Sequence, residues 1–268
     1  MFVRFAVLLI SLTLFTRSTF AAEAADSAVI GRKIDDFTLT DYRGKEVSLQ
    51  EFQDRKLIVV AFLGTDCPLA NLDGPRLESL AKKYESQGVG FLGVNSNRQD
   101  TLTEIAAHAR RHGITFPVLK DGGHTVANAF GAIRTPEVFV LDADRVVRYW
   151  GRIDDQYGVG YVRDNVDTSY LGNALDELLA GKSVSTPVVE AVGCHIGRKK
   201  EPKENSPVTY SNQIARIFNT HCIECHREGE IGPFPLTNYD EVVGWAEMIR
   251  EVVNEKRMPP WHADQKHG

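Results

Sequence analysis

The stretch from Asn219 to Gly229, NTHCIECHREG, carries two cysteines and a histidine at close spacing. Cys222 and Cys225 lie three positions apart and His226 follows directly, which gives the pattern C-x-x-C-H. Two thiols at this spacing can form a redox dithiol, supply half of a zinc site, or add to the two vinyl groups of a haem whose iron the histidine then binds. The sequence around the motif has to decide among these three chemistries.

That sequence favours haem. A zinc site needs a second pair of ligands, and the chain has four cysteines with no second C-x-x-C pair. A thioredoxin-type dithiol opens a helix within a β-α-β unit, whereas this pair follows a helical stretch and precedes the loop REGEIGPFP. We therefore expect one covalent haem c on Cys222 and Cys225, with His226 as an axial iron ligand. A redox or structural disulfide is the alternative.

Cys67 and Cys194 are the remaining thiols. Cys67, in FLGTDCPLA, follows a strand-like run and precedes a helix, whose N-terminus can stabilise a thiolate and lower its pKa. In an oxidising compartment the two cysteines could pair, with Cys194 as a resolving cysteine or a structural staple, or both could stay reduced. His195 could tune Cys194, bind metal with it, or lie on the surface.

The N-terminus indicates export. An eleven-residue apolar run follows Arg4 and leads to a small-residue cleavage site that ends at Ala21, which predicts a signal peptide over residues 1–21. The run is too short to span a bilayer, so we expect a periplasmic or otherwise extracytoplasmic protein with no stable membrane span after cleavage. An uncleaved anchor is the alternative.

The charge balance disfavours nucleic acid as a partner. Removal of the signal peptide takes away Arg4 and Arg17, so 31 basic side chains become 29 against 36 acidic ones, a net charge near −7. Such a surface does not attract phosphate backbones. The oligomeric state cannot be derived from the composition.

The elements that would position Cys67 alternate between strand and helix from about Gly31 to Gly181. Apolar, β-branched runs predict strands, and residues at helical spacing predict helices. The predicted strands are Lys56–Gly64, Val89–Ser96, Glu137–Asp142 and Arg145–Ile153, and the predicted helices are 76–88, Thr101–His112, one near Ala127 and Tyr170–Leu179. The order β-α-β-α-β-β-α implies an α/β domain over residues 31–180, with a mixed sheet and helices on both faces.

This domain resembles the thioredoxin-like fold, in particular the secreted redoxin and peroxiredoxin (AhpC/TSA) branch. The resemblance rests on FLGTDCPLA around Cys67 and on RTPEVFVLD, in which Thr135-Pro136 matches the family's cis-proline loop. It implies thiol chemistry on a peroxide or a disulfide through Cys67, with redox proteins as partners. Arg134 is then either a group that stabilises the Cys67 thiolate or a solvated arginine.

The sequence departs from the family at several positions. Ala70 stands where thioredoxins carry their second cysteine, and Gly64 and Val60 stand where peroxiredoxins carry a threonine or serine and a proline. Thr65 is offset from the family's threonine by one position. These departures keep a second reading open, in which the domain only docks a partner.

The C-terminal part of the chain resembles class I c-type cytochromes, over about Ser211 to Trp261. Residues 181–208 predict a linker or a strap, and residues 209–268 a small all-α cytochrome domain. The resemblance maps the second axial ligand onto Met258, with His262 as its competitor, whereas Met248 fits the core of a helix. Ten residues follow Met258, so we expect an abbreviated domain or the front part of a larger haem enzyme.

Two other polar pairs have both a functional and a structural interpretation. His108 and His112 are four residues apart on a predicted helix, which suits a metal ion, but the flanking arginines favour a solvated basic face. Asp154 and Asp155 are expected at a polar rim without a catalytic role. The whole sequence thus predicts an exported oxidoreductase that joins a thiol-based redoxin to a mono-haem electron carrier.

Overall fold

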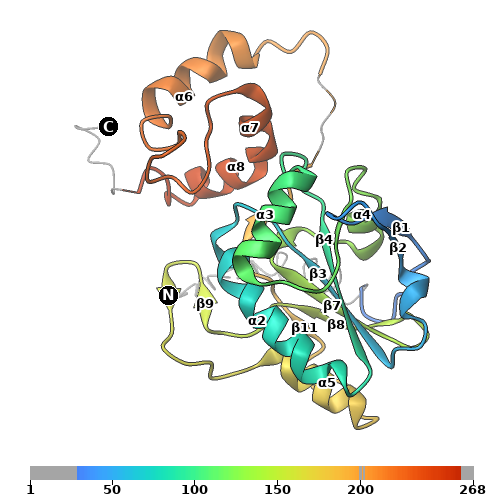
Figure 1. Cartoon of the computed structure of the whole chain (residues 1–268). Helices are drawn as coiled ribbons and strands as arrows, with labels where there is room; N and C mark the ends of the chain where they lie inside the picture. The colour runs from blue at the N-terminus through green and yellow to red at the C-terminus, as the bar shows by residue number, and fades with distance from the viewer. Residues whose placement is uncertain (1–28, 199–200, 202, 261–268) are drawn as a thin grey trace, which may run out of the picture.

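The computed structural model describes residues 29–198, 201 and 203–260. Figure 1 shows an α/β unit and, beside it, a separate lobe formed by the C-terminal helices. The predicted signal peptide and His262 lie outside the described residues. Within the described residues, no helix has the length and apolar character needed to cross a membrane.

A six-stranded mixed sheet forms the centre of the α/β unit, in the order β11-β8-β7-β3-β4-β5. β3 pairs in parallel with β4 and antiparallel with β7, so the predicted mixed sheet is confirmed. The strands are β3 (Leu57–Phe62), β4 (Val89–Asn95), β5 (Val118–Lys120), β7 (Glu137–Asp142), β8 (Val147–Gly151) and β11 (Val188–Val189). β5 is an addition to the predicted order and lies between two helices that the sequence placed in succession.

Helices cover both faces of this sheet, as expected. Side chains of β3 alternate between two buried clusters: Val59 packs with α2 (Pro68–Glu85), α3 (Leu102–His112) and α5 (Tyr170–Leu179), whereas Val60 packs with α4 (Thr125–Phe130). This alternation is what the period of two along a strand produces when both faces are buried. The α/β unit therefore has the predicted thioredoxin-like architecture.

Short strands complete the α/β unit. β1 (Thr38–Thr40) and β2 (Glu46–Ser48) form a hairpin that leads into a 3-10 helix, η1 (Leu49–Phe52), and β9 (Tyr157–Gly158) pairs with β10 (Tyr161–Val162). The segment after α5 also joins the unit. It adds β11 to β8 in parallel, and it adds β12 (Cys194–His195) to β6 (Arg134–Thr135) in antiparallel register.

The lobe at the C-terminus consists of a π-helical turn, η2 (Tyr210–Ile214), followed by α6 (Ala215–His221), α7 (Tyr239–Gly244) and α8 (Ala246–Asn254). The single helix predicted from Thr237 is two helices, because the backbone leaves helical geometry at Trp245. Asn238, rather than Thr237, caps α7 by accepting a hydrogen bond from the Glu241 amide. Met248 of α8 is buried in the core, as predicted, whereas Val253 is exposed.

Candidate active site

Cys67 lies at the start of α2, where the chain leaves the central strand β3. It is the N-cap residue of the helix, and Pro68 follows in the first turn, a position that needs no amide hydrogen. The side chain is fully buried, and its Sγ donates a hydrogen bond to the Thr135 carbonyl oxygen at 2.8 Å. The Thr135–Pro136 peptide bond is cis. The structure thus places Thr135 and Pro136 against Cys67, where the sequence expected them.

Cys194 completes a pair of thiols at this loop. Strand β12 places Cys194 opposite Thr135, and Cys194 and Cys67 lie in the same buried cluster. Cys194 is 8% exposed and Cys67 is 0% exposed. The two cysteines, far apart in the sequence, are therefore neighbours in the fold.

The surroundings shift the pKa values of the two thiols in opposite directions. Burial raises the pKa of Cys67, but hydrogen bonds from the Cys194 thiol and the Ala70 amide outweigh it and lower that pKa to about 7. The same hydrogen bond to Cys67, together with burial, raises the pKa of Cys194 well above its usual value. Cys67 is therefore the nucleophile of the pair, and Cys194 holds the proton.

Arg134 and His195 lie side by side at the edge of the thiol pair, because β6 and β12 pair them in register. Arg134 donates to the Gly193 carbonyl at 2.8 Å and to Glu251 of α8 at 2.8 Å, and His195 Nε2 lies 2.7 Å from the same carboxylate. Arg134 is thus an ion-pair partner of Glu251, and its charge lowers the pKa of Cys194; a role at the Cys67 thiolate stays a prediction.

No sequence motif marks Glu251, and it was missed. Its ion pair with Arg134 joins positions 117 residues apart, and a single glutamate on an amphipathic helix looks like a solvated residue. Burial raises its pKa, but Arg134 and His195 outweigh burial and lower it to about 2, so Glu251 is a carboxylate at neutral pH.

The histidine pair on α3 has a structural setting, and the expected solvated face is wrong. His108 is buried and packs on His112, with ring centroids 4.5 Å apart. Burial is the main cause that lowers the pKa of His108 to about 4, and the neighbouring His112 adds to it, so the His108 ring is neutral at pH 7. Throughout the described part of the chain, no three His, Cys, Asp or Glu side chains are grouped to hold a metal ion.

Asp154 and Asp155 are buried rather than exposed at a rim. Asp154 pairs with Arg76 of α2, and Asp155 accepts hydrogen bonds from the amides of Asp167 and Thr168, so the first fixes its loop against α2 and the second closes the loop on itself. Asp73 shares this cluster. Burial, together with Asp154, raises its pKa to about 7, and its charge also acts on Cys67. Sequence reasoning missed Asp73, which reads as an ordinary polar position of a helix.

The C-x-x-C-H segment lies in the lobe, directly after α6. A turn closes on the Cys222 carbonyl, which accepts from the amides of Cys225 at 3.2 Å and His226 at 2.9 Å, and all three side chains are half-buried. His226 Nδ1 lies 3.0 Å from the Phe234 carbonyl oxygen. A carbonyl only accepts, so Nδ1 donates and the Nε2 lone pair stays free for a metal. These residues fit a covalently tethered haem.

Met258, the predicted second axial ligand, lies just beyond α8. It is half-buried, and its amide donates to the Val252 carbonyl at 3.1 Å. Aromatic side chains fill the space between α7 and the haem motif: His226 packs on Phe234, and Phe234 stacks on Trp245 at 3.8 Å between centroids. The role of Met258 at the iron stays a prediction.

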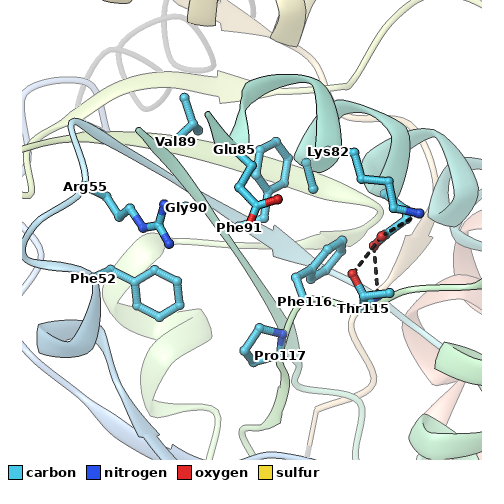
Figure 2. Close-up of a pocket in the computed structure, with 12 residues that line it drawn as sticks. Phe52, Arg55, Lys82, Glu85, Val89, Gly90, Phe91, Thr115, Phe116 and Pro117 are labelled. Carbon is cyan, nitrogen blue, oxygen red and sulfur yellow. Dashed lines mark hydrogen bonds and ion pairs between the residues drawn. The ribbon is translucent and has the colours of Figure 1, made fainter. Parts of the chain in front are cut away.

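One surface cavity lies away from both cysteine sites. It has a volume of about 230 Å³ and is lined by the C-terminal half of α2, the start of β4 and residues 115–117, as Figure 2 shows. Cys67 precedes this part of α2 by three helical turns, about 16 Å along the axis. Glu78 in the cavity wall is already bonded to Thr115 and Lys82, so we assign no chemistry to it.

A thiol of lowered pKa at a helix N-terminus, held against a cis-proline loop on a mixed sheet, defines a thioredoxin-fold thiol oxidoreductase. Comparison with known proteins agrees. Residues 30–150 match the AhpC/TSA family. The thiol-disulfide oxidoreductase ResA of Halalkalibacterium halodurans is 31% identical over 137 residues, which are 51% of this chain and 76% of that protein. ResA of Geobacillus thermodenitrificans is 30% identical over 46% of this chain and 68% of that protein.

Two solved structures share the fold. A hypothetical protein from Sinorhizobium meliloti superposes with a TM-score of 0.59 at 35% identity, covering 64% of this chain and 96% of that one. An uncharacterized conserved protein from Geobacillus kaustophilus superposes with a TM-score of 0.57 at 29% identity, covering 65% of this chain and 93% of that one. The chain belongs to the AhpC/TSA family, and it is an oxidoreductase of the thiol type.

Proposed function

We propose that the protein is an extracytoplasmic thiol-disulfide oxidoreductase whose redox pair is Cys67 and Cys194, joined to a mono-haem c-type electron-transfer lobe. The observation that carries the thiol half is the placement of Cys67 and Cys194 in one buried cluster, with Cys194 paired opposite Thr135 and the Thr135 carbonyl accepting from Cys67. The compartment rests on the predicted signal peptide. Substrates of this class are disulfides of partner proteins, as the name of the ResA relatives indicates for those proteins.

The first step is attack by the Cys67 thiolate on one sulfur of a partner disulfide. The partner's S–S bond breaks, a mixed disulfide forms on Cys67, and the partner's other sulfur leaves as a thiolate that takes up a proton. The carbonyl of Thr135, which accepts from the Cys67 thiol in the resting protein, keeps the sulfur oriented along the cis-proline loop.

The second step is attack by Cys194 on the Cys67 sulfur. The pKa of Cys194 is high mainly because its thiol donates to Cys67, and that interaction ends when Cys67 enters the mixed disulfide. The charge of Arg134 then favours the Cys194 thiolate. The Cys67–Cys194 bond forms, the partner's second thiolate leaves, and two electrons have passed to the partner; in reverse, the same steps oxidise a partner dithiol.

The haem proposal rests on Cys222, Cys225 and His226. The two thiols would form thioether bonds to the porphyrin, and His226, oriented by the Phe234 carbonyl, would be the proximal ligand. A haem bound there supplies single-electron transfer. Met258 is our candidate for the opposite ligand, and a methionine there favours a high reduction potential.

A second function is supported by one observation: neither Cys67 nor Cys194 is open to a partner in this structure. An electron carrier whose redoxin unit only docks another protein needs no exposed thiol. Reduction of a peroxide through Cys67 is a third candidate function. Gly64 stands at the position of the peroxiredoxin threonine, which disfavours it.

The thiol proposal is tested with full-length protein in glutathione redox buffers, in a Cys222→Ala/Cys225→Ala background that removes the haem thiols. We expect peptide mapping to find a Cys67–Cys194 disulfide at an oxidising poise. Cys194→Ser should accumulate a glutathione adduct on Cys67, because the resolving thiol is gone, and Cys67→Ser should form neither product. Free Cys67 and Cys194 across the whole range of redox poise would leave the docking function as the better account.

A further inference from the structure

We propose that the C-terminal lobe is a lid on the redox site, held shut by Glu251, and that a partner protein has to displace it to reach Cys67. This proposal rests on the function proposed above for the thiol pair. The lid comprises α6, α7 and α8 with the turns between them, residues 215–254.

The apolar part of the contact seals the thiols. Cys67, Ala70 and Cys194 form one buried cluster with five residues of the lobe, Phe218, Leu236, Val242, Trp245 and Met248. Trp245 is 2% exposed, although it lies at the break between two short helices. The lobe therefore shares its core with the redox site, and the proposal expects the burial of Cys67 to depend on the lobe being in place.

The polar part of the contact is a latch. The Glu251 carboxylate takes hydrogen bonds from Arg134 on β6 and lies 2.7 Å from His195 on β12, while Arg257 holds it from the lobe side at 2.5 Å. The side chains of Glu251 and Arg134 are 16% and 22% exposed, so solvent screens them little. A second ion pair, Arg98–Asp240, crosses the contact at its exposed edge.

The Glu251 carboxylate contacts both strands that carry the redox residues, β6 and β12. Arg134 precedes Thr135, His195 follows Cys194, and the two strands are paired in register. A partner that approaches the cis-proline loop must therefore take the place of α8. Loss of the Glu251 contacts should raise the population in which the lobe has moved away from Cys67.

The test compares Glu251→Gln with Glu230→Gln in the full chain. Glutamine keeps the shape of the side chain and removes its charge, and Glu230 loses an ion pair to Arg227 that stays within the lobe. The readout is the labelling rate of Cys67 by iodoacetamide and by a bulky maleimide, followed by peptide mapping. We expect Glu251→Gln to label about tenfold faster, the size of a lost charge-assisted contact, and Glu230→Gln to label like the wild type.

Measurement from pH 6 to 9 separates lid opening from thiol acidity. Opening multiplies the rate by the same factor at every pH and favours the bulky reagent, whereas a change in the Cys67 pKa moves the midpoint. Wild-type rates in Glu251→Gln, or a shifted midpoint alone, overturn the lid. If Glu251→Gln unfolds, as circular dichroism would show, Asp240→Asn weakens the exposed ion pair and should give a smaller increase.

The lid and the redox function can fail separately. A Cys67–Cys194 disulfide that forms normally, with labelling unaffected by Glu251→Gln, removes the lid and leaves the redox pair. Faster labelling in a protein that forms no such disulfide under any redox poise removes the redox pair and leaves the lid.

Discussion

Asp73 shows how a single buried carboxyl links the thiol site to stability. It is 8% exposed, and its ion-pair partner Arg76 lies 3.6 Å away and also pairs with Asp154. Burial and Asp154 raise its pKa from 3.8 to about 7, so the folded protein retains a proton that the unfolded chain has lost. Asp73 therefore lowers the free energy of unfolding as the pH rises from about 4 to about 7.

Asp73→Asn should remove this dependence. We expect the substitution to raise the free energy of unfolding by roughly 2–3 kcal/mol more at pH 8 than at pH 5, because the folded wild-type carboxyl loses its proton only between these two pH values. Urea unfolding at the two pH values measures the difference. Asp54→Asn, at an exposed position, is the control and should change both values equally. An equal effect of Asp73→Asn at both pH values would contradict the shifted pKa.

At this scale the sequence predicts which residues are reactive but not what they touch. Cys67 and the Thr135-Pro136 loop were identified because a thiol after a strand and a proline before one have local signatures. The contact between Cys67 and Cys194 stayed open, and the ion pair of Arg134 with Glu251 was missed. These errors share one cause: the partners come from β12 and α8, which only the tertiary fold brings to β6.

Among the elements, the strap strand β12 determines whether the thiols meet. It reaches β6 at Gly193, where an added Cβ would lie 2.1 Å from the Thr135 carbonyl oxygen and 2.7 Å from its carbon. These are backbone atoms of the cis-proline loop, which cannot give way as a flexible side chain can. Only a residue without a side chain allows the strap to approach this closely.

Gly193→Ala should therefore push the strap away from the loop. We expect slower formation of the Cys67–Cys194 disulfide and a loss of about 1–3 kcal/mol in the free energy of unfolding, as for other overpacked sites. Thiol mapping and urea unfolding measure the two effects. Gly122→Ala is the matched control, because an added Cβ there meets nothing within 4 Å. Disulfide formation at the wild-type rate would show that the close approach is not needed.

The strength of the local signal explains which elements could be predicted. The bounds of β7 and α5 agree with prediction, because β7 is a continuous apolar run and α5 has clear helical spacing. β5, β6, β11 and β12 have two or three residues each, too few for any period to appear. The start of α2 was placed too late, since Pro75 inside the helix reads as a boundary.

For the whole molecule, the haem proposal gives the sharpest expectation. Protein exported from a host with haem-ligation machinery should gain the mass of one porphyrin on the peptide that holds Cys222 and Cys225. Cys222→Ala/Cys225→Ala should lose that mass and keep the disulfide chemistry of Cys67, because the proposed redox pair of Cys67 and Cys194 includes neither of these thiols. Exported protein without porphyrin would remove the electron-transfer half of the proposal.

The second ligand is tested in the same preparation. Met258→Ala should change the visible spectrum of the haem protein, since replacement of a thioether ligand alters the ligand field of the iron. The spectrum of His262→Ala should match that of the wild type. The opposite pattern would move the ligand from Met258 to His262.

The arrangement of the two units could not be predicted from the sequence. Each was recognised by its own motifs, whereas the contact between them depends on shape and on single side chains such as Trp245 and Glu251, which no motif records. The sequence therefore supported two separate sites, and the structure shows one shared core.

The position of Ala70 has a consequence for the entropy of the chain. This residue, where thioredoxins carry their second cysteine, is fully buried against the lobe, and the second thiol comes instead from the strap. A C-x-x-C disulfide closes a ring of four residues, whereas a bond between Cys67 and Cys194 would close a loop of about 130 residues. Loops of that size remove on the order of 5 kcal/mol of freedom from a denatured chain. Each turnover would thus form and break a bond that closes most of the α/β unit into one loop. The thermal stability of the protein would therefore follow the redox poise of its surroundings.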